Sequence, residues 1–274
     1  MSDRCSPRPN RWALIYFTCF AVFTQVVPAT AQVGPAPVTR EIIVARLKVA
    51  YPDYIAGLEG DDVVFKDGTR LPFDDGRDKT FEEWLANPDI EDMFRLPYPR
   101  GREAVVPAEN FDPGRARNEA FFSKIYGDCR KPDFSKSLIA VAWLPSKSRQ
   151  RLLVTTINGV ADKLKAISTE LDALPAKFNV FLVPAAGAFN CRAIAGTGRR
   201  SAHGYGIAID IAVKHSRYWR WAPGRAVAKP VYRNEIPREI VNIFEKHGFI
   251  WGGRWYHYDT MHFEYRPELL DPSN

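Results

Sequence analysis

The segment SAHGYGIAIDIA, residues 201–212, joins a histidine and two glycines to an apolar run that contains one aspartate. Glycines on both sides of Tyr205 let the backbone turn tightly just after His203. The residues that follow, 207–213, alternate larger and smaller side chains and predict a β-strand. This alternation puts Asp210 on the face that otherwise carries alanines, so space for a metal ion is left beside its carboxylate.

A second segment, HYDTMHFE at residues 257–264, supplies another histidine with an acidic neighbour. Catalytic zinc takes three protein ligands from imidazole nitrogen and carboxylate oxygen, and it keeps a fourth position for water. The predicted ligands are therefore His203, Asp210 and His262. Asp259 is the candidate general base. Residues three apart on a continuous strand face opposite ways, so this role requires a turn before His262.

These motifs resemble those of a known family. The patterns His-x-x-Gly-x-Ala-x-Asp and Asp-x-x-His-Phe-Glu, joined by GFIWGGRW at 248–255, are similar to the zinc D-alanyl-D-alanine carboxypeptidases of the VanY type. Relatives of that group include phage endolysins that cut L-Ala-D-Glu bonds in peptidoglycan. The resemblance covers roughly residues 138–269. It implies a Zn²⁺ cofactor held by His203, Asp210 and His262, with Asp259 as the catalytic base.

The family also uses an arginine before the first histidine to bind substrate and stabilise developing charge. Arg192 matches this position best, and Arg199 and Arg200 are its rivals. Two polar neighbours of the motifs allow two interpretations each. Glu264 would either support His262 or form a plain salt bridge, and Ser201 would either hydrogen-bond a ligand or shape a turn.

His257 has the opposite strand parity from His262, which favours a position at the rim of the cleft over metal binding. His215 and His247 lack partners at metal spacing and are expected to be structural or solvated. The aromatic residues around 251–256 would line a substrate groove or pack in the core.

The start of the chain has the features of a secretory signal peptide. Three arginines precede an apolar run over residues 12–27, and Ala29-Thr30-Ala31 fits a cleavage site. An uncleaved anchor is the alternative, but a spanning helix needs about 20 residues. We therefore expect an exported protein, periplasmic or extracellular, without a stable membrane anchor. Two of the four cysteines, Cys129 and Cys191, then remain to form a disulfide or stay as free thiols.

Composition is that of a soluble globular protein, with 46% hydrophobic and 26% charged residues among 274. The formal charge of +6 falls to +4 when residues 1–31 are removed. Such a mildly basic balance suits an anionic envelope polymer. The basic residues are scattered, so no nucleic-acid partner is expected.

Helices and short strands are predicted in no regular alternation, which indicates an α+β fold with a small mixed or antiparallel sheet around the zinc site. We divide the chain into a signal peptide at 1–31, an N-terminal appendage with a small hairpin at 32–136, and a zinc peptidase domain at 137–274. Helices are expected at 40–51, 81–85, 158–174 and 237–247, and strands at 63–65, 70–73, 138–144, 180–183, 207–213 and 262–265.

Two functions fit these features. The first is a zinc peptidase that acts on peptidoglycan stem peptides, and the second is a module of the same fold that binds wall peptides without cutting them. The chain has neither the Ser-x-x-Lys of serine enzymes for this substrate nor a His-Glu-x-x-His helix. The acidic candidate base favours the enzyme. The bond that is cut, D-Ala-D-Ala or L-Ala-D-Glu, and the role of residues 32–136 stay open.

Overall fold

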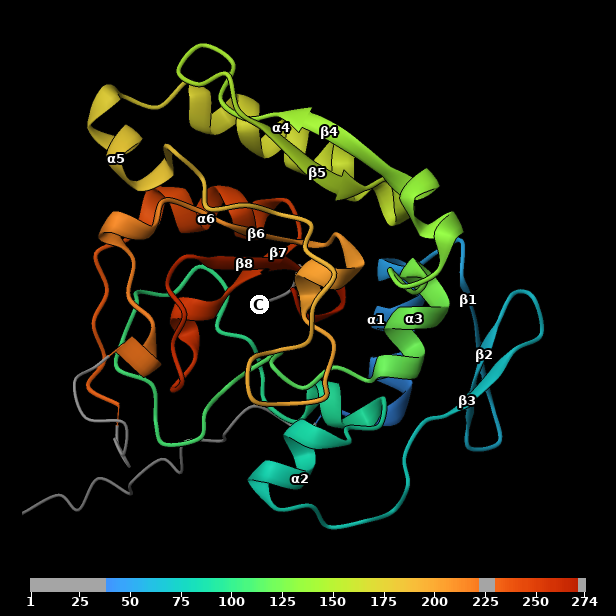
Figure 1. Ribbon diagram of the computed structural model, residues 1–274. Coiled ribbons are helices and arrows are strands. Elements are labelled where there is room, and N and C mark those ends of the chain that lie inside the picture. The colour runs from blue at the N-terminus through green and yellow to red at the C-terminus, as the bar shows by residue number, and fades with distance from the viewer. Residues whose placement is uncertain (1–37, 222–229, 271–274) are drawn as a thin grey trace, which may run out of the picture. The chain divides into compact units, whose positions relative to one another are not determined.

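The computed structural model describes residues 38–221 and 230–270 (Figure 1). The predicted signal peptide at 1–31 lies outside the described residues. From Val38 onward the described chain falls in one compact unit. No helix in these two ranges is long and apolar enough to cross a membrane.

A three-stranded antiparallel sheet lies at the centre of the part that carries both motifs. Its order is β6-β8-β7, with β6 at Ala208–Asp210, β7 at Phe249–Trp251 and β8 at His262–Tyr265. Helix α6, Arg238–Lys246, packs against β7 through its buried apolar side. There the ring of Phe244 stacks on that of Phe263 with centroids 3.9 Å apart. The helix thereby closes one face of the sheet and fixes β8 in place.

A second layer consists of a hairpin and one long helix. Strands β4, Leu138–Ala142, and β5, Arg151–Thr155, pair antiparallel, and α4, Val160–Asp172, packs on both of them (Figure 1). Buried residues of α4 recur at helical spacing, at Val160, Leu164, Ile167 and Leu171. The helix also contacts α6, so the two layers share one core.

The region before residue 137 has its own small sheet, of order β1-β2-β3. The predicted hairpin is confirmed. Strand β2, Asp62–Phe65, pairs with β3, Arg70–Pro72, across the turn at Gly68, and β1, Ile55–Glu59, adds an outer strand. Three helices complete this region: α1 at Arg40–Ala50, α2 at Phe81–Ala86 and α3 at Glu119–Tyr126.

The α+β class is confirmed, with short antiparallel sheets and flanking helices. One predicted strand is wrong. Residues 180–183 belong mostly to a short helix, α5 at Asn179–Leu182, in which Leu182 is buried and Val180 exposed. An apolar run of four residues is too short for its periodicity to distinguish a helix from a strand. The strand expected at 207–213 is confined to β6.

Candidate metal centre

The sheet register explains how the two motifs meet. In the antiparallel pair β6–β8, Asp210 lies directly opposite His262. Residues that face each other in this way have Cβ atoms about 4.5–5.5 Å apart on one face of the sheet. His203 comes from the 3-10 helix Ala202–Tyr205 just before β6, and Gly206, with φ 70°, turns the chain between them. A Cβ added at Gly206 would lie 2.9 Å from the backbone nitrogen of Thr155, so only glycine fits there.

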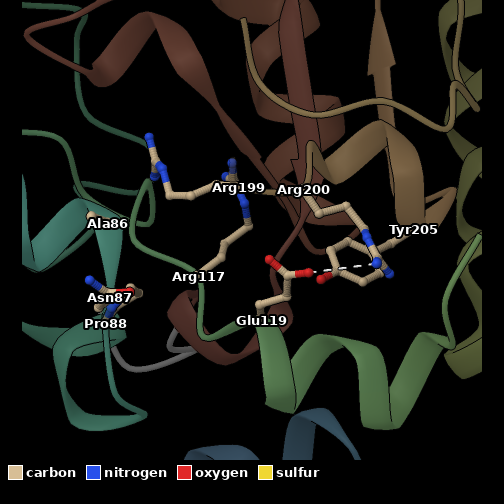
Figure 2. A pocket seen from close by; sticks show the side chains of 8 residues that line it. All are labelled: Ala86, Asn87, Pro88, Arg117, Glu119, Arg199, Arg200 and Tyr205. Atoms are coloured by element: carbon tan, nitrogen blue, oxygen red, sulfur yellow. Dashed lines mark ion pairs between the residues drawn. The ribbon is translucent and has the colours of Figure 1, made fainter. Parts of the chain in front are cut away.

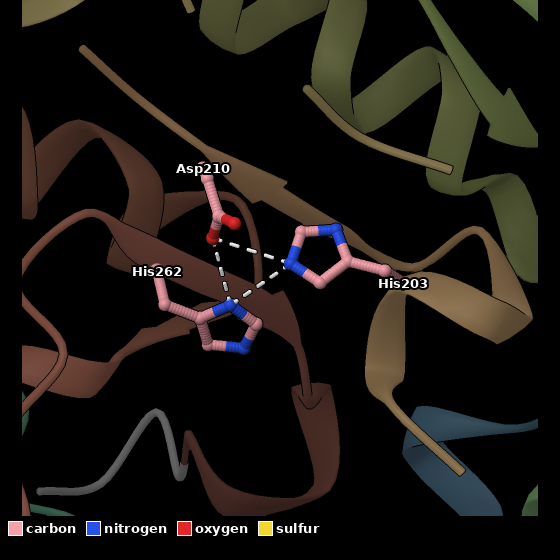
Figure 3. Close-up of side chains that lie close together, drawn as sticks. All are labelled: His203, Asp210 and His262. Carbon is pink, nitrogen blue, oxygen red and sulfur yellow. Dashed lines mark hydrogen bonds and ion pairs between the residues drawn. The ribbon is translucent and has the colours of Figure 1, made fainter. Parts of the chain in front are cut away.

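The three predicted ligands lie together in space (Figure 3). Nε2 of His203 is 3.2 Å from Oδ1 of Asp210, and Nδ1 of His262 is 3.0 Å from the same oxygen. The two ring nitrogens are 3.2 Å apart. Zinc bonds of about 2.0–2.1 Å at tetrahedral angles place donor atoms about 3.3 Å apart. The triangle of donor atoms therefore has nearly the size of one face of a zinc tetrahedron.

Hydrogen bonds at the far side of each imidazole set its tautomer. Nδ1 of His203 donates to the carbonyl oxygen of Ala188, which leaves Nε2 with a free lone pair. Nε2 of His262 donates to Oε2 of Glu264 at 3.0 Å, which leaves Nδ1 free. When both imidazoles are neutral, two lone pairs and a carboxylate oxygen converge with no proton among them. Such a donor set fits a bound cation.

Glu264 is fully buried and is the anchor of His262. Nη1 of Arg117 donates to both of its carboxylate oxygens, at 3.0 and 2.8 Å, and Nη1 of Arg266 adds a contact at 3.2 Å. Burial alone would raise the pKa of Glu264, but Arg117, His262 and Arg266 together hold it well below its usual value. Glu264 thus both orients His262 and forms salt bridges with arginines. The two roles that the sequence left open for Glu264 are therefore both present.

The electrostatics of the centre favour a positive charge between its carboxylates. Burial opposes ionisation of His262, yet Asp210 and Glu264 raise its pKa to about 10. Burial would likewise raise the pKa of Asp210, but His203 and His262 lower it far below its ordinary value. The centre is therefore arranged to hold a cation, and the residues that would hold a metal ion are the three predicted from the sequence.

Asp259 lies beside this cluster, and the turn that its role requires is present. Residues 260 and 261 form the turn, and the amide of His262 donates to the carbonyl oxygen of Asp259 at 3.2 Å. Oδ1 of Asp259 is buried and has no hydrogen-bond partner among the described residues. Burial raises the pKa of this carboxyl to about 6; the charge of His262 opposes the shift and that of Asp210 adds to it. The unpartnered oxygen of this carboxyl, beside the three candidate ligands, is available to accept a proton.

The glycine pair of the GFIWGGRW segment allows the chain to pack around Asp259. A Cβ added at Gly252 would lie 2.6 Å from the backbone oxygen of Asp259. The amide of Asp259 donates to the Gly252 carbonyl oxygen at 3.0 Å. Of the nearby tryptophans, Trp251 is buried in the core, whereas Trp255 lines the cavity described next.

A cavity of about 290 Å³ opens over the cluster and contains His203, Asp210, His262 and Asp259 in its wall. Arg192 is exposed and lines this cavity, and Nη1 of Arg192 contacts only the carbonyl oxygen of Ala193, at 3.4 Å. Ser201 also lines the cavity, and its backbone oxygen accepts from the amide of Gly204. Arg192 thus stands where a substrate group could reach it, and its role stays a prediction.

Arg115 and Arg117, from the region before residue 137, also line the cavity and were missed in the sequence. Ala116 between them is buried against Trp84 and Leu85, so the two arginines face the opposite way, toward the cavity. The alternation Arg-Ala-Arg was the only signal available. Nothing in it indicates which distant segment the arginines face.

Hydrogen bonds from side chains of the motif-bearing part to backbone carbonyl oxygens hold the segment before Arg115 in place. Nε1 of Trp255 donates to the carbonyl oxygen of Pro113 at 2.7 Å, and the guanidinium of Arg266 donates to that of Gly114. These contacts cross the boundary predicted between residues 136 and 137. That boundary stays a prediction, but residues 32–136 supply part of the cavity wall.

His257 lines the cavity over the candidate ligands and the neighbouring hollow. Its Nδ1 is 2.7 Å from Oδ2 of the buried Asp112, and its ring lies between those of Phe81 and Trp219. It lines the metal cavity without belonging to the cluster. His215 and His247 each contact a glutamate well apart from the centre, Glu235 and Glu170 respectively.

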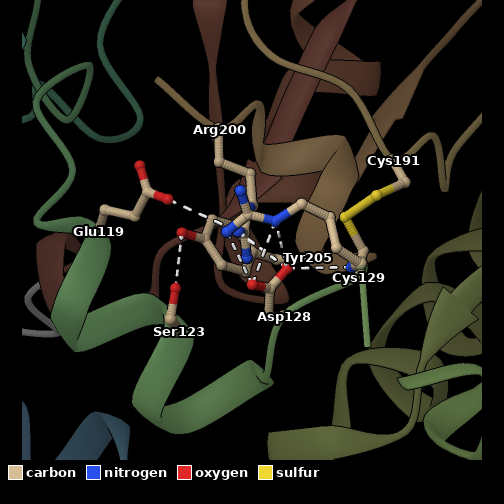
Figure 4. The surroundings of a disulfide bond; sticks show 8 residues. Glu119, Ser123, Asp128, Cys129, Cys191, Arg200 and Tyr205 are labelled. Carbon is tan, nitrogen blue, oxygen red and sulfur yellow. Dashed lines mark hydrogen bonds and ion pairs between the residues drawn. A yellow bond between two sulfur atoms is a disulfide. The ribbon is translucent and has the colours of Figure 1, made fainter. Parts of the chain in front are cut away.

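Cys129 and Cys191 form a disulfide, with Cα atoms 5.7 Å apart (Figure 4). It joins the end of α3 to the segment that carries the candidate arginines. Arg200 lies beside it, donates to Asp128 at 2.9 Å and covers the ring of Tyr205. Arg200 is buried in this network and does not line the metal cavity.

Comparison with known proteins gives one match. Residues 195–265 match a family model described as D-alanyl-D-alanine carboxypeptidase. No curated protein and no solved structure matches the chain. The matched stretch contains the three cluster residues and Asp259 but not Arg192. Members of this peptidase family are typically metal-dependent, which agrees with the donor set. The resemblance predicted from the two motifs is confirmed: residues 195–265 are similar to the D-alanyl-D-alanine carboxypeptidase family of peptidases.

Proposed function

We propose that this protein is a zinc-dependent peptidase that acts on peptidoglycan stem peptides in the manner of a D,D-carboxypeptidase. The observation that carries the proposal is the triangle formed by His203, Asp210 and His262, in which hydrogen bonds on the far side leave both ring nitrogens free for a cation. The family match over residues 195–265 supports peptide hydrolysis as the reaction.

Zinc bound there would polarise the scissile carbonyl and lower the pKa of the attacking water to about 7. The chain's own contribution is proton transfer by Asp259. Its unpartnered Oδ1 accepts a proton from the water as the oxygen adds to the peptide carbonyl carbon. The same carboxyl then returns the proton to the leaving nitrogen as the C–N bond breaks, giving a carboxylic acid and an amine, which exchange a proton to become carboxylate and ammonium. A pKa of about 6 suits this role, because the group is mostly ionised at neutral pH and is still basic enough to take a proton.

Arg192 is the proposed cation for the substrate carboxylate or for the charge that develops on the carbonyl oxygen. It lines the same cavity as the cluster and has no carboxylate partner within the described ranges. An exposed guanidinium with its donors free can bind a carboxylate with two parallel hydrogen bonds. We propose export to the periplasm or the outside of the cell as the matching location, since stem peptides are found there.

The test is incubation of the purified protein, freed of residues 1–31, with zinc and a synthetic stem peptide ending in D-alanyl-D-alanine. Release of D-alanine, or another cut in the stem, supports the proposal. Asp259→Asn should keep zinc and lose about 100-fold to 10,000-fold in kcat, the usual contribution of a positioned base. A chelator should abolish activity, and added zinc should restore it.

Intact peptide that nevertheless binds the zinc-loaded protein would reject catalysis and favour the wall-binding module. Cleavage of ordinary L-peptides at a higher rate than of stem peptides would keep the peptidase but reject its substrate. The orphaned oxygen of Asp259 favours the enzyme, because a binding module has no need of a buried carboxylate without a partner.

A further inference from the structure

The cavity over the metal cluster does not end there. It shares Arg115 and His257 with a second cavity of about 710 Å³, and Arg117 with a third of about 250 Å³. The second and third cavities share Arg199 and Glu119. The three hollows therefore adjoin one another through shared side chains, from the candidate metal centre to the space between α2 and the segment before His203, and they are called the cleft below.

Arginines dominate the walls of this cleft. Outside the metal cluster and Asp259, the acidic lining consists of Glu82 and Glu119. Six arginines line the same walls: Arg115, Arg117, Arg192, Arg199, Arg200 and Arg220. Which of these arginines is free to bind an anion depends on the partners that the protein itself provides.

Three of these arginines are neutralised by the protein itself. Arg115 forms an ion pair with Asp112 at 2.7 Å, and Arg117 forms one with Glu264 at 2.8 Å. Arg200 pairs with Asp128 at 2.9 Å and with Glu119 at 3.6 Å. Carboxylates of the protein itself balance the charges of these three arginines, so no bound anion is needed to explain them.

Arg199 differs from them. Within the described ranges no carboxylate pairs with its guanidinium, although the side chain is only partly exposed. It lines the same hollow as Arg117, and Figure 2 shows these two side chains between residues 86–88 and the ion pair Arg200–Glu119. Burial, together with the positive charges of Arg117 and Arg115, lowers the pKa of Arg199 to about 10. A partly buried cation beside two others is costly unless an anion joins them.

We propose that Arg199 forms a second anion subsite that binds a carboxylate of an acidic peptide at a distance from the bond being cut. The inference rests on the proposed function for the identity of the substrate. The subsite is distinct from the place of Arg192, because Arg192 lines the metal cavity and Arg199 lines only the two hollows beyond it. The cleft would thus select peptides that carry a free acid in addition to the cleavable end.

A carboxylate within the peptide fits this position better than a free ion does. The hollows that Arg199 lines adjoin the cavity over the candidate ligands at Arg115 and Arg117, so one extended peptide would span both. The guanidinium of Arg199 can offer a carboxylate two parallel hydrogen bonds. Phe81 and Trp219 line the larger hollow and offer apolar contact to the aliphatic parts of the peptide.

The experiment compares one peptide in two forms. The acidic form is L-Ala-γ-D-Glu-L-Lys-D-Ala-D-Ala, and the neutral form carries D-isoglutamine in place of the glutamate. Binding is measured by calorimetry on zinc-loaded protein that carries Asp259→Asn, alone or together with Arg199→Gln. Arg149→Gln is the matched control, because Arg149 is exposed and lies outside the walls of all three cavities.

Arg199→Gln should weaken binding of the acidic peptide about tenfold or more, the usual loss for one charge-assisted hydrogen bond, and change that of the neutral peptide by less than about twofold. Arg149→Gln should affect neither peptide. Arg199→Lys should retain part of the preference, which separates the loss of charge from misfolding. Equal effects of Arg199→Gln on both peptides, or no measurable binding of the acidic form, would overturn the subsite.

Cleavage of the same two peptides by protein with Asp259 intact distinguishes this inference from the proposed function. If neither peptide is cut but the preference that depends on Arg199 persists, the peptidase proposal fails and the subsite stands. If both are cut and the preference for the acidic form is absent, the subsite fails and the peptidase stands.

Discussion

The metal centre and the arginine-lined cleft beside it were built in different ways. The centre comes from two short segments that meet in one sheet, where Asp210 faces His262 across β6 and β8. The cleft gathers side chains from residues 81–87, 115–119, 192–200 and 219–220, most of them outside any strand. The first region is thus a product of strand pairing, and the second is a product of packing between loops and helices.

This difference suggests that the two regions have different tasks, metal binding in the first and peptide recognition in the second. Strand register fixes atoms tightly, and a metal site needs donor atoms placed to within about 0.5 Å. Recognition of a peptide tolerates looser placement and gains from long arginine side chains that come from several segments. The shared residue is Arg117, which lines the cleft while it holds Glu264 behind His262. The predictions below test how far the two regions are independent.

The largest effect is expected from loss of a ligand. His203→Ala should weaken zinc binding by more than about 100-fold, the upper end of the loss seen for groups that only support a ligand. His257→Ala is the matched control, because His257 lines the same cavity but pairs with Asp112. Zinc content by elemental analysis should fall to near zero in the first variant and stay at one equivalent in the second. The opposite pattern would show that the ligand set was assigned wrongly.

A smaller effect is expected from the disulfide, which holds the segment carrying the candidate arginines to α3. Changing both Cys129 and Cys191 to serine opens a link across 62 positions and should lower the free energy of unfolding by about 2–4 kcal/mol. Urea denaturation measures this loss, and a reducing agent added to the unaltered protein should reproduce it. Zinc content of the folded variant should be unchanged. A parallel loss of zinc would mean that the centre depends on the cleft.

The smallest effect is expected from a change to the residue that hydrogen-bonds a ligand. Glu264→Gln replaces the carboxylate that receives the Nε2 proton of His262 and should weaken zinc binding about 10-fold to 100-fold. Competition with a coloured chelator gives the affinity. Glu170→Gln is the control, since Glu170 contacts His247 in a comparable way and does not touch the centre. Equal zinc affinity in Glu264→Gln and the unaltered protein would reduce Glu264 to a salt-bridge partner.

Periodicity in the sequence predicted the longer elements well. Helices α1, α4 and α6 repeat their apolar residues at helical spacing and were found close to their predicted bounds. Strands β1, β5 and β7 were not predicted. They are three to five residues long, and a stretch of that length shows too few alternations to stand out from its neighbours.

The sequence by itself predicted which residues form the candidate centre, because ligand type and motif spacing can be seen along the chain. It named His203, Asp210, His262 and Asp259, and it showed that a turn had to precede His262. Only the tertiary structure decided that Glu264 supports His262, that Arg115 and Arg117 enter the cavity, and that Arg199 is left without a partner. These contacts depend on which distant segments pack together. The spacing of residues in a motif does not predict such packing.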